Sequence, residues 1–252
     1  MHHSQSANDK IETNGISLGI SRVSTSEKLV SALRQVNISV PPRTEGRRTH
    51  HTEVWTFCRL LSTLANYDQL SFPVTVNHRD RPDFLIEFGD TVVGVEVTEA
   101  ISKQFAAFCA LAEREFPDVF VEPAHFRWGA PKLTVEEMRS LLRKSHLTSD
   151  GWVGDRPEQE WALFVQSVVG LKLAKLTRPG FAHFDQNWLA VYDNLPLPNI
   201  HLGKAIAILQ PLVQDCWSRV PGFDVLFIEH GPVIAQVTEN SADHLILNDL
   251  WE

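Results

Sequence analysis

Two acidic residues, Asp83 and Glu96, belong to a stretch whose pattern brings them together. Residues 81–99 read as two strands rich in Val, Ile and Phe, joined by a turn at Gly89 and Asp90. Glu96 lies within an otherwise apolar strand, where a carboxylate is costly unless it is paired or binds a cation. If the strands pair around the turn, Asp83 and Glu96 meet at the same end of the hairpin. Carboxylate oxygens that converge there suit Mg²⁺ or Mn²⁺.

The hairpin resembles the signature of the restriction-endonuclease-like, or PD-(D/E)XK, nuclease superfamily. Pro82 and Asp83 correspond to its Pro-Asp pair, and Glu96 and Val97 begin its Asp/Glu-X-Lys triplet. The resemblance implies an α/β fold, namely a restriction-endonuclease-like α/β/α sandwich with a mixed central sheet. It also implies that the two acids hold the metal while a Lys activates the attacking water. Thr98 stands where that Lys is expected, so the resemblance leaves catalysis open.

A helix expected over residues 52–67 precedes the hairpin and carries Glu53. Apolar residues recur along one stripe of this segment, and Thr52 is a candidate N-cap. In the resembling family a Glu on this first helix often faces the metal site, which makes Glu53 a candidate auxiliary ligand. Alternatively, Glu53 complements the positive end of the helix dipole.

A second long helix, expected over residues 157–176, carries two lysines on its apolar side. At 100° per residue, Lys172 and Lys175 point towards the face that holds Trp161, Val165 and Val169. Some nucleases of the resembling superfamily supply the catalytic Lys from this following helix, so Lys172 or Lys175 could replace the group missing at Thr98. The alternative is snorkelling, in which the stems cover apolar surface and the ammonium groups reach water.

The remaining pattern predicts one nuclease-like α/β domain over residues 46–252, after a polar, partly mobile leader at 1–45. A helical insertion is expected at about 100–150. The other elements expected from periodicity and turn signals are helices at 29–36, 101–115, 134–144 and 201–217 (bent at Pro211), strands at 72–76, 119–121 and 188–192, and a hairpin over 223–237.

The composition restricts the classes of partner that this protein can bind. The chain of 252 residues carries a net charge of −8, which argues against indiscriminate nucleic-acid binding. A nuclease remains compatible, because a metal would neutralise the carboxylates and because arginines cluster near the motif, at positions 43, 47, 48, 79 and 81.

The cysteines and the hydropathy indicate where in the cell the protein is expected. The three cysteines fall on apolar helix faces without a Cys-X-X-Cys pair, which indicates reduced core residues rather than a zinc site. No stretch is apolar and long enough to span a membrane, and no signal peptide is visible. We therefore expect a cytoplasmic protein that does not bind membranes.

Two functions are compatible with the sequence. The first is Mg²⁺- or Mn²⁺-dependent hydrolysis of phosphodiester bonds in nucleic acid, DNA more than RNA, with Asp83, Glu96 and Glu53 at the metal and Lys172 or Lys175 at the water. The second is a catalytically inactive nuclease-fold domain that binds nucleic acid or a protein. The two lysines on the apolar face of the 157–176 helix favour the first function, whereas the net negative charge and Thr98 favour the second. Whether the chain forms a homodimer stays open.

Overall fold

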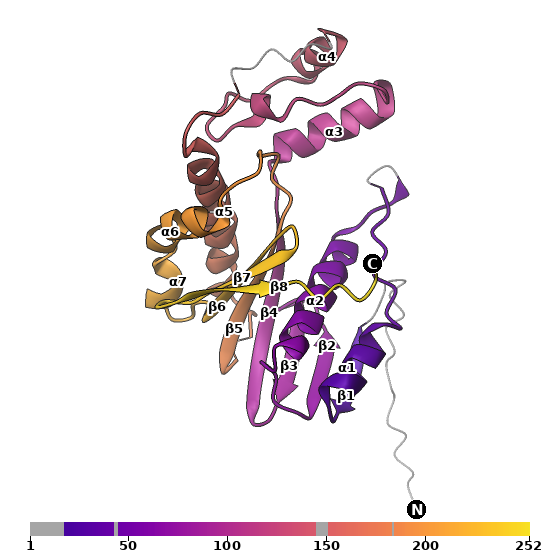
Figure 1. The fold of residues 1–252 in the computed structure, drawn as a ribbon, viewed down its shortest axis with the longest axis vertical. Helices are drawn as coiled ribbons and strands as arrows, with labels where there is room; N and C mark the ends of the chain where they lie inside the picture. Colours follow the sequence, from indigo (N-terminus) through magenta and orange to yellow (C-terminus); the bar gives the residue numbers. More distant parts are fainter. Residues whose placement is uncertain (1–17, 43–44, 145–150, 183) are drawn as a thin grey trace, which may run out of the picture.

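The chain folds around an eight-stranded mixed β-sheet (Figure 1). The computed structural model describes residues 18–42, 45–144, 151–182 and 184–252. The α/β class expected from the sequence is confirmed. Within these residues the strands lie side by side in chain order: β1 (Gly19–Val23), β2 (Val74–His78), β3 (Phe84–Phe88), β4 (Thr91–Ala100), β5 (Gln186–Asp193), β6 (Val225–His230), β7 (Val233–Val237) and β8 (Ala242–Ile246).

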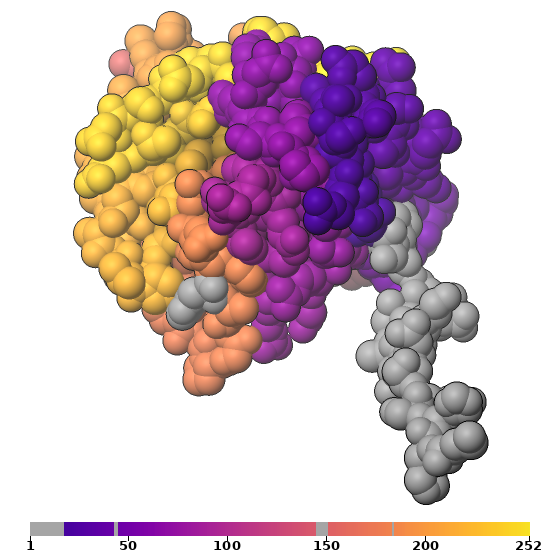
Figure 2. Space-filling view, turned by 90° about the horizontal axis from the view of Figure 1, so that it is seen from below, coloured from indigo at the N-terminus to yellow at the C-terminus, as the bar shows by residue number. Residues whose placement is uncertain are grey.

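Parallel pairing is found in the middle of the sheet. Strand β5 runs parallel to both β4 and β6, whereas the other neighbouring strands are antiparallel. Parallel neighbours need a crossover connection, and helices lie in both of these connections. In Figure 2 the colours accordingly pass across the molecule from indigo and violet to orange and yellow.

Helices cover both faces of the sheet. The helices are α1 (Ser26–Leu33), α2 (Thr49–Asn66), α3 (Lys103–Glu115), the 3₁₀ turn η2 (Pro123–Phe126), α4 (Val135–Lys144), α5 (Arg156–Leu176), α6 (Leu202–Leu212) and α7 (Asp215–Ser218). Buried residues of α1 and α2 form one core cluster with β2, β3 and β4, and those of α5 and α6 form a second cluster with β5, β6 and β7. None of the helices that the structure describes is long and apolar enough to cross a lipid bilayer.

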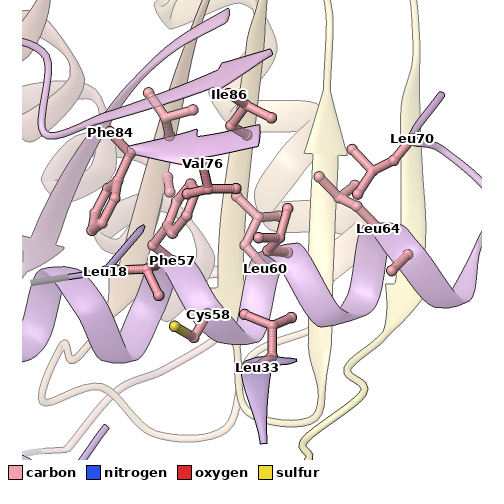
Figure 3. Close-up of a cluster of buried hydrophobic side chains, with 14 of the residues drawn as sticks. Leu18, Leu33, Phe57, Cys58, Leu60, Leu64, Leu70, Val76, Phe84 and Ile86 are labelled. Atoms are coloured by element: carbon pink, nitrogen blue, oxygen red, sulfur yellow. The ribbon is translucent and has the colours of Figure 1, made fainter. Parts of the chain in front are cut away.

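Strict alternation along β3 and β4 decides which side chains reach which helix. Phe84 and Ile86 of β3 and Val93, Val95 and Val97 of β4 are buried in the α1–α2 cluster. The rings of Phe57 and Phe84 stack there with centroids 3.9 Å apart (Figure 3). The intervening positions, Glu96 among them, therefore face α5 on the other side of the sheet.

The register of the hairpin agrees with the turn read from the sequence. Gly89 has a φ of 56° and allows the tight turn between β3 and β4. Phe84 pairs with Val95 and Phe88 with Thr91. Extending this register by one step places Asp83, just before β3, opposite Glu96. The described part of β4 continues past this point to Ala100 and pairs there with β5.

Helices α3 and α4 form a small body of their own above the sheet in Figure 1. With η2 they enclose a separate cluster of buried apolar side chains, which includes Phe108, Phe126 and Leu142. A capping box begins α4, in which Glu137 Oε2 accepts a hydrogen bond from Thr134 N at 2.7 Å and Thr134 Oγ1 accepts one from Glu137 N at 3.3 Å. The strand expected at 119–121 is wrong, because these residues form no strand.

Other departures from the sequence predictions lie at element ends and sheet edges. Thr52 is not an N-cap, because α2 begins three residues earlier after Arg48. The helix expected at 201–217 is divided into α6 and α7 shortly after Pro211. Strands β1 and β8 were not expected at all. Residues 1–17 of the expected leader lie outside the described residues. After them, β1 pairs with β2 at the edge of the sheet, and α1 packs against α2 with Leu29 and Leu33 fully buried.

A methyl group at position 94 is expected to destabilise the fold. A Cβ added at Gly94 would lie 2.6 Å from a ring carbon of Phe184 and 3.0 Å from Cγ of Pro82. Forcing these groups apart costs about 1–3 kcal/mol. Urea denaturation of Gly94→Ala should show this loss, whereas Gly170→Ala, where a Cβ would meet nothing within 4 Å, should not be destabilised. Equal stability of wild type and Gly94→Ala would contradict the close packing around Pro82.

Candidate active site

The two acids of the hairpin and one lysine of α5 meet on the α5 face of the sheet. Lys172 Nζ lies 2.6 Å from Glu96 Oε2 and 3.3 Å from Asp83 Oδ2. Asp83 Oδ2 also accepts a hydrogen bond of 2.7 Å from the backbone N–H of Val97, which fixes this carboxylate against β4. The side chains of Glu96, Lys172 and Asp83 are 4%, 10% and 13% exposed. The structure thus brings together three of the residues that the sequence singled out.

The three groups are coupled electrostatically. Burial raises the pKa of Glu96, and the neighbouring Asp83 raises it further, although Lys172 acts in the opposite direction. For Lys172, burial opposes the charged form, but the attraction of Asp83 and Glu96 outweighs it and the pKa is raised. Lys172 is therefore a charged ammonium group held by two carboxylates. One positive charge against two negative charges leaves this buried cluster with an excess of negative charge.

Helical spacing explains why Lys172 is buried and Lys175 is not. Val165, Val169 and Lys172 follow one another at intervals of four and three residues, and all three are buried. Lys175 lies at the edge of this face and is exposed. It lines the cavity next to the carboxylates, but the ion pairs of Asp83 and Glu96 are made by Lys172. The sequence had placed both lysines on the apolar face.

Glu53 projects from the first turns of α2 into the same region. Burial raises its pKa to about 7, with a further contribution from Asp83. Glu53, Asp83 and Lys172 line one cavity of about 480 Å³. Among the residues that the structure describes, however, no three His, Cys, Asp or Glu side chains are close enough to hold a metal ion together. Glu53 is thus near the two hairpin acids without forming a three-carboxylate site with them.

The raised pKa of Glu53 predicts how stability varies with pH. An acid whose pKa is raised by folding binds a proton in the native state that the unfolded chain has already released. The free energy of unfolding therefore falls as the pH rises from about 4.5 to about 7. In EDTA, the variant Glu53→Gln should lack this part of the fall, and its advantage over wild type should be larger at pH 8 than at pH 5. Urea denaturation at both values measures this, and an advantage that does not change with pH would contradict the raised pKa.

Arginines near the start of α2 complete one side of the cavity, which Arg47 and Arg48 line. Arg47 is held in place, because it donates to Thr52 Oγ1 at 3.0 Å and to Glu99 Oε1 at 3.4 Å. Glu99 Oε1 also accepts a hydrogen bond of 2.6 Å from Asn194 Nδ2, which lies just after β5. No sequence pattern pointed to Glu99 or Asn194, although Glu99 lies three residues after Glu96 on the same strand.

Arg79 and Arg81 do not line this cavity. Arg81 lines a second cavity next to it, together with Asp83 and Glu96. The guanidinium of Arg79 lies 5.8 Å from the ring centre of Phe184. Arg43 lies outside the residues that the structure describes.

A second buried charged cluster lies on the α2 face of the sheet. Arg59 of α2 forms ion pairs with Asp249 and, at 3.1 Å, with Glu229 of β6. Its guanidinium also lies over the ring of Trp55, 4.2 Å from the ring centre. Burial raises the pKa of Glu229 to about 7, and Arg59 only partly offsets this. No local pattern signalled this cluster, because Arg59 lies more than 160 residues before its two acidic partners in the sequence.

Comparison with family models, with curated proteins and with solved structures found no match for this chain. We therefore infer the function from the geometry of the site.

Proposed function

We propose that this chain is a divergent PD-(D/E)XK-like nuclease that hydrolyses phosphodiester bonds in nucleic acid, DNA more than RNA, with Mg²⁺ or Mn²⁺. The observation that carries the proposal is the position of Lys172, whose ammonium group lies 2.6 Å from Glu96 and 3.3 Å from Asp83. A lysine beside paired strand carboxylates is the combination that the resembling family uses. Here α5 supplies the lysine, and the strand carries Thr98 at the usual position.

The buried carboxylates suit a hard divalent cation. Asp83 and Glu96 offer oxygen ligands on adjacent strands, and their charge exceeds that of the single ammonium group between them. Burial raises the pKa of Glu96, and the negative charge of Asp83 raises it further. Asp83 and Glu96 would hold the ion, with Glu53 as an auxiliary group nearby. Bound there, Mg²⁺ would lower the pKa of a coordinated water and offset negative charge on the phosphate.

The other residues have separable tasks. The Lys172 ammonium group can hold the attacking water or a phosphate oxygen through its N–H donors. Glu53, with a pKa of about 7, can take up or release a proton near neutral pH. Arg48 and Lys175 line the cavity and can bind phosphate oxygens. Each task belongs to a group that the structure places at the same cavity.

The competing function is a binding module without catalysis. In this alternative, Lys172 forms a purely structural ion pair with Glu96 and Asp83, because its ammonium group already neutralises part of their charge. Thr98 and the net charge of −8 favour this alternative. A cytoplasmic location remains a prediction from the sequence under either function, and a homodimer is compatible with both.

A cleavage assay decides between the two. Purified wild type is incubated with single-stranded DNA, duplex DNA and RNA, each with Mg²⁺, Mn²⁺ or EDTA. We expect metal-dependent cleavage that falls by about a hundredfold or more in Glu96→Gln and Lys172→Met. Lys204→Met is the matched control, because Lys204 lies on α6 in an exposed pair with Asp155, 3.1 Å long.

The outcomes separate cleanly when folding is checked by circular dichroism. Folded Glu96→Gln that still cleaves at the wild-type rate would refute the role of the hairpin acids. Undiminished cleavage by Lys172→Met would refute the role of the α5 lysine. If wild type cleaves none of the three substrates with either metal, the binding-module function becomes the better one.

A further inference from the structure

A second cavity adjoins the first at the candidate site. Its volume is about 360 Å³, and its walls include Arg81, Arg178 and Phe181. Asp83 and Lys175 line both cavities. The two cavities therefore share part of their walls, including the carboxylate of Asp83 that pairs with Lys172. We call the two cavities together the groove, whose lining residues extend from the start of α2 to the loop after α5.

Charged groups of both signs line this groove. Asp83 lines both cavities, and Glu96 lines the second. Arg48 lines the first cavity and Arg178 the second, and both arginines are exposed. Arg47 is tied to Glu99, and Arg81 makes a 3.6 Å ion pair with Asp80, in which both side chains are mostly exposed. Such an exposed pair contributes little and leaves Arg81 available to another anion.

The depth of the site favours a flexible substrate. The side chains of Glu96 and Lys172 are at most 10% exposed, so a reacting phosphate must enter the groove to reach them. A duplex is stiff and holds its backbone on the outside of a wide cylinder, whereas a single strand can bend into a groove. The net charge of −8 also disfavours the broad cationic surface on which duplex DNA is held.

We propose that the two cavities bind one nucleic-acid single strand that passes through the site, with phosphates on either side of the scissile bond held by Arg48 at one end and Arg178 at the other. The inference rests on the proposed function for the position of the bond, and it adds the form of the substrate and the direction in which it lies. A groove with phosphate-binding groups at both ends does not require a strand terminus, so cleavage within a chain follows.

Binding in EDTA tests the groove without requiring catalysis. The probe is a fluorescein-labelled DNA oligonucleotide, single-stranded or annealed to its complement, titrated with wild type, Arg48→Met and Arg178→Met over a salt series. We expect each variant to bind the single strand on the order of tenfold more weakly. The slope of log K against log salt should fall by about 0.7 for each phosphate contact removed. Arg143→Met is the control, because Arg143 is exposed on α4 in a pair with Glu136.

Two binding results would overturn the proposal. One is wild-type affinity for the single strand in both Arg48→Met and Arg178→Met. The other is tighter binding of the duplex than of the single strand by wild type. Weaker binding in only one variant overturns a groove that holds the strand at both ends.

A cleavage arm tests passage through the groove. Circular single-stranded DNA has no ends, and we expect wild type with Mn²⁺ to cut it about as fast as the linear strand. Cleavage of the linear strand alone would overturn an open groove. If neither DNA is cut, DNA hydrolysis as the proposed function fails, and the binding measurements still decide whether the groove holds a strand.

Discussion

Lys172→Met is expected to lose about 3–5 kcal/mol of stability at pH 8 in EDTA, because it leaves two buried carboxylates without their ammonium partner. The methionine keeps much of the apolar stem, so the loss reports charge rather than packing. Lys204→Met removes a lysine from an exposed pair and should cost less than about 1 kcal/mol. Urea denaturation gives both values.

Two conditions should restore part of the stability of Lys172→Met. The pKa of Glu96 is already raised in wild type, and the loss of Lys172 raises it further. A raised acid pKa favours the native state as the pH falls, so the deficit at pH 8 should shrink at pH 5. Added Mg²⁺ should stabilise the variant if Asp83 and Glu96 bind the ion, because a ligand that binds the native state shifts unfolding. A deficit that neither condition reduces would contradict a buried ion pair between Lys172 and these carboxylates.

Arg59→Met is expected to have a comparable effect on the opposite face of the sheet. The substitution leaves Glu229 and Asp249 buried without a positive charge, which costs about 3–5 kcal/mol. Because burial already raises the pKa of Glu229 to about 7, the loss should be greater at pH 8 than at pH 5. Arg219→Met, which removes an arginine from an exposed pair with Asp215, is the matched control.

A double variant and limited proteolysis make this second prediction specific. Arg59→Met combined with Glu229→Gln should recover part of the stability, because one of the two unpaired charges is gone. Proteases should also cleave the segment around Asp249 faster in Arg59→Met than in wild type. A double variant no more stable than Arg59→Met would show that the loss arises from packing against Trp55 instead.

The hairpin could be predicted from sequence because its signals are local. Gly89 and Asp90 specify the turn, and the turn sets the register that places Asp83 opposite Glu96. The central strand β5 was equally clear, since a strand between parallel neighbours is apolar on both faces. Strands β1 and β8 lacked that signal. They lie at the two edges of the sheet, and most of their residues are exposed or half-buried.

The sequence predicted which residues form the site but not how they are arranged in space. Helical periodicity places Lys172 and Lys175 on one broad face, and only the packing of α5 against β4 and β5 separates the buried lysine from the exposed one. Glu53 was found through a resemblance, and its distance from the other acids depends on how α2 crosses the sheet. The pairing of Arg59 with Glu229 and Asp249 connects residues far apart in the chain, so no window of sequence contains it.

The agreement between strand order and chain order has a consequence for synthesis on the ribosome. Each new strand can join the edge of the sheet that the preceding strand has just formed, so the sheet can grow as the chain emerges. The cluster around Arg59 can form only later. Glu229 and Asp249 lie more than 160 positions after Arg59, so the Arg59 guanidinium lacks both of these acidic partners until they have been synthesised. A nascent chain stalled before residue 229 would therefore contain every residue of the candidate site. It would still lack the ion pairs of Arg59 with Glu229 and Asp249.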